Sequence, residues 1–302
     1  MKYVKEENTL NIPEDFEQSF FKSPYITTDL TAKVMLKSKG IVDNVDIKIL
    51  YFIYETKFCT KDQIRRWAKY EGIEDDELFD RLNMMFSNTI INKFGFVDEK
   101  NYKGQLPPDI KVFYCLHDGG KHLLDNFSGD DFIDWQAGYN VTHTKNVIKA
   151  LVSAELYTQL YTSGAELVFH TRRPLFIIHV DRFFGGDTFC IRKDNETHYY
   201  ICDTFLSSDR TSLVRNKLLN YESVVTTKIW RRNYRDYGTT PHLIFVTDDD
   251  NSAAILAGEI GELKCNDFLV STKDRLLSGI GTSSSFLAFN KESNELYPTS
   301  LI

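Results

Sequence analysis

The sequence lacks the patterns that define several large classes of protein. Its longest apolar runs are short pieces such as IKILYFIY, and none reaches the roughly 20 residues that a membrane-spanning helix needs. The first residues, MKYVKEENTL, carry too much charge for a secretory signal peptide. We therefore expect a cytoplasmic protein with no membrane partner.

Cysteine and histidine are too scattered to indicate a metal site. The five cysteines include no C-x-x-C pair, and the seven histidines form no H-E-x-x-H motif or comparable pair. The sequence therefore predicts no metal and no cofactor, and it predicts free buried thiols at Cys59, Cys115, Cys190, Cys202 and Cys265.

A basic domain is also missing. The net charge is −7, and none of the segments 1–43, 44–127 and 128–302 is positive. A protein that mainly binds nucleic acid without sequence preference usually carries a positive domain. Any contact with DNA must therefore come from local clusters of basic residues.

What the sequence does contain is enough apolar material for a folded protein of two domains. It has 302 residues, of which 42% are hydrophobic and 14% aromatic. Residues 1–43 show little pattern and are interpreted as an N-terminal extension. We expect the first domain over residues 44–130 and the second over residues 131–302.

The first domain carries the signals of three helices followed by a hairpin. An apolar stripe from Ile47 to Tyr54 predicts the first helix, and Thr60 with Gln63 forms a capping box that starts the second. Apolar residues from Leu78 to Phe86 predict the third helix. Two strand-like runs, IINKFGFVDEK and IKVFYCL, come next. This order is typical of a winged helix-turn-helix, a fold that binds DNA or serves only protein interaction.

The second domain alternates strands and helices, which is typical of an α/β or α+β domain. A long helix is predicted through THTKNVIKALVSAELYTQLYTSG, and another from about Ser208 to Val225. The predicted strands are PLFIIHVD, THYYICDTF, PHLIFVT, DFLVST and SFLAFN.

Several short segments together carry a resemblance to a known family. They are TKDQIRRW, KVFYCLHDGGKHLL, THTKNVIKALVSAEL, YYICD, LVRNKLLNYESV with Lys217 and Tyr221, PHLIFVTDDDNSAAILA and DFLVSTKDRLLSG. In these segments, over residues 45–280, the chain resembles the replication-relaxation family of plasmid and mobile-element proteins. The resemblance implies an α+β protein, with a winged helix-turn-helix followed by a restriction-endonuclease-like domain of the PD-(D/E)xK type.

A nuclease of this type needs one carboxylate at the end of a core strand, and an acid and a lysine two positions apart on the next strand. Asp181 supplies the first carboxylate and Asp203 the second, but Phe205 stands where the lysine belongs. Lys217, on the following helix, is a possible replacement. An active Mg²⁺-dependent endonuclease would use these three residues. The alternative, which we prefer, is a domain without catalysis whose aspartates are structural, with partners among Arg182, Arg192 and Arg210.

Candidate contacts with DNA lie on both domains. The outward face of the third helix carries Asn83, but also the acids Asp76, Glu77 and Asp80, which would repel phosphates. The basic candidates are Lys61, Arg65, Arg66 and Lys69 on the second helix, Lys100, Lys103 and Lys111 in the wing, and Arg231, Arg232 and Arg235 beside aromatic residues. For each group the alternative is an ordinary charged or packed surface.

These observations favour a non-catalytic DNA-binding accessory or regulatory protein of plasmid or mobile-element replication or transfer. Its expected partners are double-stranded DNA, replication or transfer proteins of the same element, and a second copy in a possible homodimer. The alternatives are the Mg²⁺-dependent endonuclease and a protein-interaction adaptor that does not bind DNA.

Overall fold

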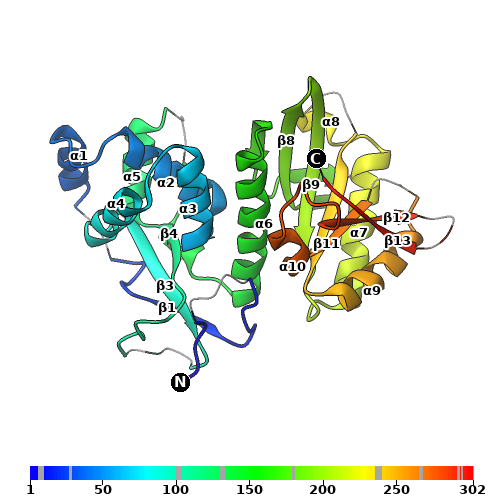
Figure 1. Ribbon diagram of the computed structural model, residues 1–302, viewed down its shortest axis with the longest axis horizontal. Helices are drawn as coiled ribbons and strands as arrows, with labels where there is room; N and C mark the ends of the chain where they lie inside the picture. The colour runs from blue at the N-terminus through cyan, green and yellow to red at the C-terminus, as the bar shows by residue number, and fades with distance from the viewer. Residues whose placement is uncertain are drawn as a thin grey trace. The chain divides into compact units, whose positions relative to one another are not determined.

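The chain is mixed α+β and divides into two compact units, Met1–Ala154 and Glu155–Ile302 (Figure 1). The computed structural model describes residues 1–5, 10–26, 29–99, 102, 104–129, 133–178, 181–234, 240–264, 268–290, 293 and 295–301. The division falls within helix α6 (Thr144–Thr162), whereas the sequence predicts a boundary after residue 130.

Unit 1 contains the three predicted helices, α2 (Asn44–Thr56), α3 (Lys61–Tyr70) and α4 (Asp75–Ser87). A further helix, α5 (Asp118–Phe127), follows the hairpin. The predicted capping box is confirmed: the Gln63 amide donates to Thr60 Oγ1 at 3.1 Å, and the Thr60 amide donates to Gln63 Oε1 at 2.9 Å. These bonds satisfy amides that the first turn of α3 leaves without helical partners.

The sheet of unit 1 has the strand order β1-β3-β4-β2. Strands β2 (Phe58–Thr60), β3 (Ile91–Val97) and β4 (Phe113–Leu116) pair antiparallel. Phe94 is the centre of the apolar core on this sheet, with the rings of Phe58, Phe96 and Phe113 5.5 to 5.6 Å from its own.

The first 43 residues contribute to this unit. Strand β1 (Glu17–Phe20) pairs antiparallel with β3, and Tyr3 forms an isolated bridge to Val97. Helix α1 (Leu30–Ser38) follows, with Asp29 as its N-cap. A short 3₁₀ helix, Ala137–Asn140, precedes α6.

Unit 2 is built on a seven-stranded sheet with the order β13-β12-β11-β10-β9-β8-β5. Strands β9 (Glu196–Thr204), β10 (His242–Thr247) and β11 (Phe268–Thr272) run parallel, and the other neighbours are antiparallel. The remaining strands are β5 (Glu166–Thr171), β8 (Asp187–Lys193), β12 (Phe286–Asn290) and β13 (Glu295–Thr299).

Helices cover this sheet in the regions that the alternating pattern predicts. Helices α7 (Thr211–Thr226) and α9 (Asp250–Gly261) lie along the sheet in Figure 1 and pack into one apolar cluster with Ile201 and Phe245. The short helices α8 (Arg231–Tyr234) and α10 (Lys273–Leu277) complete the unit.

One predicted strand differs from the structure. The run PLFIIHVD was expected to end at Asp181, but β6 (Leu175–Ile178) stops earlier and Asp181 begins the next strand, β7 (Asp181–Phe184). The two strands form a separate antiparallel pair in which Ile178 is opposite Asp181. The prediction failed because one apolar run does not reveal where a hairpin turns.

Two predictions from composition can be compared with the described residues. Cys59, Cys115, Cys190 and Cys202 are buried free thiols, as expected, while Cys265 lies outside the described residues. Across the part of the chain that the structure describes, no helix is long and apolar enough to cross a membrane.

Candidate functional site

The structure brings Asp203 together with Lys217 and Tyr221. Asp203 lies near the end of β9, and the other two residues lie one turn apart on α7. Asp203 Oδ2 accepts hydrogen bonds from Lys217 Nζ at 2.5 Å and from the Tyr221 hydroxyl at 2.7 Å. Asp203 Oδ1 accepts from the Thr204 amide at 2.8 Å. The carboxylate therefore has partners on both oxygens.

A close contact between two strands fixes this cluster. The Gly186 amide donates to the Tyr221 hydroxyl at 2.6 Å, so the tyrosine joins α7 to both β9 and the start of β8. A Cβ atom on residue 186 would lie 1.9 Å from the carbonyl oxygen of Cys202. Glycine is required here because any side chain would force the strands apart.

The cluster is largely shielded from water. Asp203 and Tyr221 are buried, while the Lys217 side chain is 37% exposed. Burial raises the pKa of Tyr221, and the charge of Asp203 and its hydrogen bond raise that pKa further. Tyr221 therefore stays a neutral hydroxyl that donates to Asp203, and Lys217 supplies the opposite charge.

A second carboxylate, Asp187, lies on the neighbouring strand but points to the other face of the sheet. Asp187 is paired with Cys202 in the antiparallel register, so these two side chains share a face. Asp203 is the next residue along β9 and therefore points to the opposite face. Asp187 Oδ2 accordingly lies 3.8 Å from His170 Nε2, and the His170 ring stacks on Phe189.

Asp181, the other predicted catalytic acid, does not join this cluster. It is an exposed residue of β7, in the two-stranded sheet, and the described residues place no ion pair or hydrogen bond on its side chain. The predicted structural partners also differ from those observed. Lys217 takes the place of an arginine at Asp203, and Arg192 pairs with Glu166 at 2.7 Å.

The arrangement offers little to a metal ion. Within the described residues, no group of three or more His, Cys, Asp or Glu side chains is placed to hold one. A two-carboxylate Mg²⁺ site needs oxygens that converge on one point, and Asp187 and Asp203 diverge. Lys217 also neutralises the charge that Asp203 would offer to the ion.

The basic residues of α3 form the second candidate site, and most have partners within unit 1. Arg65 pairs with Asp75 at 2.8 Å, and Arg66 pairs with Asp62 at 2.8 Å. Lys61 Nζ lies 4.5 Å from the centre of the Phe79 ring. Lys69 is exposed and has no partner among the residues that the structure describes. Exposed pairs such as Arg65 with Asp75 are weak enough to open for a phosphate.

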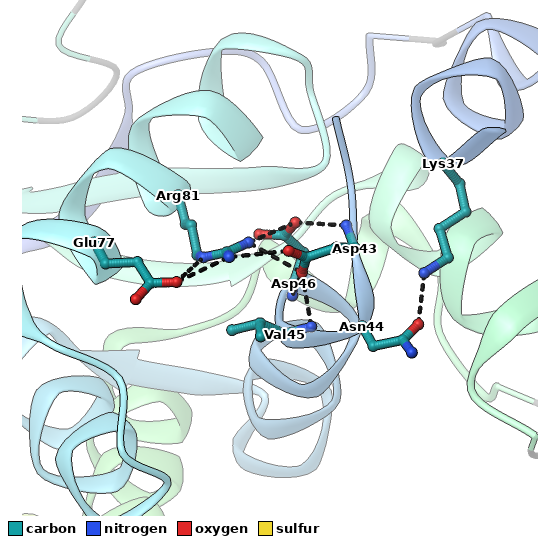
Figure 2. Close-up of polar contacts among 7 residues, drawn as sticks. All are labelled: Lys37, Asp43, Asn44, Val45, Asp46, Glu77 and Arg81. Carbon is teal, nitrogen blue, oxygen red and sulfur yellow. Dashed lines mark hydrogen bonds and ion pairs between the residues drawn. The ribbon is translucent and has the colours of Figure 1, made fainter. Parts of the chain in front are cut away.

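The exposed face of α4 is acidic, as the sequence predicts. Asp76, Glu77, Asp80 and Asn83 are all exposed. Arg81 is the single basic residue of this helix, and it is turned toward α2 (Figure 2).

Three carboxylates hold Arg81 in that position. Its guanidinium donates to both oxygens of Asp43 at 3.0 and 2.9 Å, reaches Asp46 Oδ2 at 3.0 Å and reaches Glu77 Oε1 at 2.9 Å (Figure 2). Burial acts against the charge of Asp43, but hydrogen bonds from Arg81 and two backbone amides outweigh it and lower the pKa of Asp43. Asp46 is fully buried, so burial prevails there and raises the pKa of Asp46. Arg81 therefore joins α4 to α2 and adds no positive charge to the outer face.

Of the remaining residues predicted to contact DNA, some are exposed and one is buried. Lys111 is buried, with its ammonium 5.9 Å from the centre of the Phe113 ring. Arg231 and Arg232 are exposed on α8, but Trp230 beside them is buried and Tyr234 stacks on Phe169 at 4.9 Å. These aromatic rings therefore belong to the packed interior of unit 2. Lys100, Lys103 and Arg235 lie outside the described residues.

Sequence reasoning missed Gly186, Asp187 and Arg81. The pair of glycines before an acid in FFGGD was a usable signal for the first two, since adjacent glycines at a strand start often mark a close backbone approach. Arg81 gave no signal, because its partners on α2 lie about 38 positions away.

No family model, curated protein or solved structure matches this chain.

Proposed function

We propose that the protein is a non-catalytic DNA-binding accessory protein of mobile-element replication or transfer. Unit 1 would be a winged helix-turn-helix and unit 2 a nuclease-like domain that has lost its metal site. The observation that carries the proposal is that both carboxylate oxygens of Asp203 already have hydrogen-bond partners within the protein. Its oxygens are bonded to Lys217, Tyr221 and the Thr204 amide, and the neighbouring acid Asp187 lies on the other face.

The order of elements supports the assignment of unit 1. Helices α2, α3 and α4 precede the β3 and β4 hairpin, and β2 adds to that hairpin between α2 and α3. Three helices with a three-stranded antiparallel sheet in this order are typical of winged helices. The additional strand β1 extends the sheet on its other edge.

The core of unit 2 supports a nuclease-like fold without nuclease chemistry. With the β6–β7 pair and the short helix α8 set aside, the order α6, β5, β8, β9, α7, β10, with β9 parallel to β10, is similar to the order expected for the PD-(D/E)xK core. Fold alone does not imply activity, and the Asp203 site opposes the endonuclease alternative. Unit 2 would therefore serve as a scaffold or as a surface for partner proteins.

DNA would be held through α3 rather than read by α4. Lys69 and the weakly paired Arg65 and Arg66 lie on one helix and can contact phosphates, whereas the acids of α4 repel them. Binding would thus depend strongly on salt and little on sequence.

A fluorescence-anisotropy titration with labelled duplex DNA tests this proposal. We expect binding that weakens steeply with salt, and substitution of Arg65, Arg66 and Lys69 by glutamine should reduce the slope by about 0.9 for each phosphate contact removed. Lys193→Gln, at an exposed lysine of unit 2, is the matched control. The proposal fails if the protein binds no nucleic acid at low salt.

The second candidate function is a protein-interaction adaptor that does not bind DNA. The pairing of Arg65 and Arg66 with acids of their own unit favours it, as does the exposed acidic face of α4. Failure of the anisotropy experiment at every salt concentration would leave this candidate in place.

A further inference from the structure

Three lysines that the proposed function does not use gather at the C-terminal end of α4. Lys22 follows β1, Lys33 lies on α1 and Lys93 lies on β3. The ammonium groups of Lys22 and Lys93 are 4.5 and 4.1 Å from the centre of the same Phe86 ring. The charge of Lys22 acts on both of the other lysines. The three therefore form one cluster, although they come from three separate elements.

This cluster lacks the acids that neutralise the cations of α3. Among the described residues, no carboxylate lies within 4.0 Å of any of the three ammonium groups. Lys22 Nζ instead donates to the carbonyl oxygens of Phe86 and Ser87, at 2.7 and 3.1 Å. Asp29, whose charge reaches Lys33, is engaged as the N-cap of α1. In a chain with a net charge of −7, three lysines without a close acid are a distinctive positive site.

Burial and mutual repulsion lower the pKa values of two of these lysines. Burial lowers the pKa of Lys93, and the charge of Lys22 lowers it further. Burial likewise lowers the pKa of Lys33, with Asp29 opposing and Lys22 adding to the shift. A bound anion would reverse these effects because it stabilises the charged form of each lysine.

Exposed aromatic rings lie beside the lysines. Phe21 is 40% exposed, and its ring centre is 5.6 Å from Lys93 Nζ and 6.4 Å from the Phe86 ring. Tyr25, in the same loop, is 62% exposed. Lysines for the backbone and rings for the bases are the two components of single-strand binding sites.

Lys33 packs against the first turn of α5. A Cβ atom on Gly119 would lie 2.6 Å from the Thr89 carbonyl oxygen and 3.2 Å from Lys33 Cε, so the lysine stem covers the start of this ten-residue helix. That turn already carries the acid Asp118, and the His117 side chain accepts from the Asp118 amide. Lys33 is itself buried, so it adds positive charge to the cluster from below the surface.

We propose that Lys22, Lys33, Lys93, Phe21 and Tyr25 form a binding site for single-stranded nucleic acid. Lys22 and Lys93 contact consecutive phosphodiester groups, the buried Lys33 adds its charge to the site, and the two rings stack on bases. This inference rests on the proposed binding of DNA and adds a surface other than α3. It makes the protein able to hold a single strand and a duplex with different parts of unit 1.

The test uses the full-length protein and a labelled oligonucleotide, presented as a single strand and as a duplex of the same sequence. The variants are Lys93→Gln, the double substitution Lys22→Gln with Lys93→Gln, and Phe21→Ala. Lys39→Gln, an exposed lysine just after α1, is the matched control. Thermal unfolding of each variant shows that the fold is retained, and Lys93→Arg tests whether charge alone restores binding.

We expect each lysine substitution to lower the salt slope of single-strand binding by about 0.7 and Phe21→Ala to weaken it about tenfold. Duplex binding and the Lys39 control should change little. Retention of single-strand affinity in the double lysine variant would overturn the inference while leaving DNA binding through α3 intact. Loss of duplex binding to the same degree as single-strand binding would also overturn it, as would competition by inorganic pyrophosphate at equimolar concentration. Absence of all nucleic-acid binding in the wild type would instead refute the proposed function together with this inference.

Discussion

At the scale of single residues, the stability of unit 2 depends on a few positions where a close backbone contact or a buried charge excludes other side chains. Gly186 permits the approach of β8 to β9, and Tyr221 uses that approach to bridge Asp203 and the Gly186 amide. Asp248 and Lys273 form another shielded ion pair at 2.5 Å, with the lysine side chain 5% exposed. Such positions decide stability because the surrounding atoms are too closely packed to adjust.

Gly186→Ala tests the close approach of the strands. The added methyl would overlap the Cys202 carbonyl, so we expect a loss of about 3 kcal/mol in the free energy of unfolding, at the upper end of overpacking effects. Gly258→Ala is the control because a Cβ there meets nothing within 4 Å on helix α9. That change should stabilise the protein by about 0.5–1 kcal/mol. Urea unfolding measures both, and equal effects of the two substitutions would contradict the account.

Asp248→Asn tests the ion pair with Lys273. Burial alone would raise the pKa of Asp248, but hydrogen bonds from Lys273 and the Ser207 amide outweigh burial and lower it below the ordinary value of 3.8. Its contribution to stability is therefore present above pH 3.8 and is lost as the pH falls through the lower folded-state pKa. At neutral pH the substitution leaves Lys273 buried without its partner and should cost about 3 kcal/mol.

The pH dependence and a control complete this test. Unfolding free energy measured below pH 3.8 should fall less steeply in Asp248→Asn than in the wild type. Asp250→Asn removes an exposed pair with Arg275 and should cost at most about 1 kcal/mol. If Asp250→Asn lowers the free energy of unfolding more than Asp248→Asn does, the buried Asp248–Lys273 pair is not the more stabilising of the two.

At the scale of elements, α3 and α4 have opposite electrostatic roles. Helix α4 has three acids in its first turn and its one arginine is held by Asp43, Asp46 and Glu77. Helix α3 carries the cations, two of which pair with nearby acids. A duplex that approaches this surface therefore meets repulsion from α4 and attraction from α3.

Reversing the acids of α4 tests this balance. We expect Asp76→Lys combined with Asp80→Lys to tighten duplex binding and to increase the salt slope by about 0.9 for each new phosphate contact. Glu295→Lys, on the exposed strand β13, reproduces one charge change in unit 2 and serves as the control. If the α4 double variant binds duplex DNA no better than the control, α4 does not lie near the bound DNA.

Local signals predicted most helices, and long-range pairing explains the failures. The Thr60 capping box and the apolar stripes of α2 and α4 depend on residues three or four positions apart, so the sequence displays them directly. Strand β1 pairs with β3 about 77 positions later, and no local pattern specifies that partner. The two aspartates show the same limit: alternation along β9 was visible, but the β8 register that sends Asp187 to the other face was not.

At the scale of the whole molecule, a net charge of −7 leaves nucleic-acid binding to small positive surfaces. Lys69 on α3 and the cluster of Lys22, Lys33 and Lys93 are such surfaces within unit 1, and in unit 2 Arg231 and Arg232 are exposed. Long-range repulsion between an acidic protein and DNA would make their association slower than that of a basic protein. On the proposed function, the molecule would act by holding DNA, and unit 2 would contribute a nuclease-like framework without nuclease chemistry.

The most direct test of this central claim is incubation of the protein with duplex and single-stranded DNA and Mg²⁺, at concentrations where anisotropy shows the DNA bound. The recovered DNA is then analysed on a denaturing gel. The account predicts DNA of unchanged length with the wild type and with Asp203→Ala alike. Shortened DNA that disappears with Asp203→Ala or Lys217→Ala would contradict it and establish the Asp203 cluster as a nuclease active site.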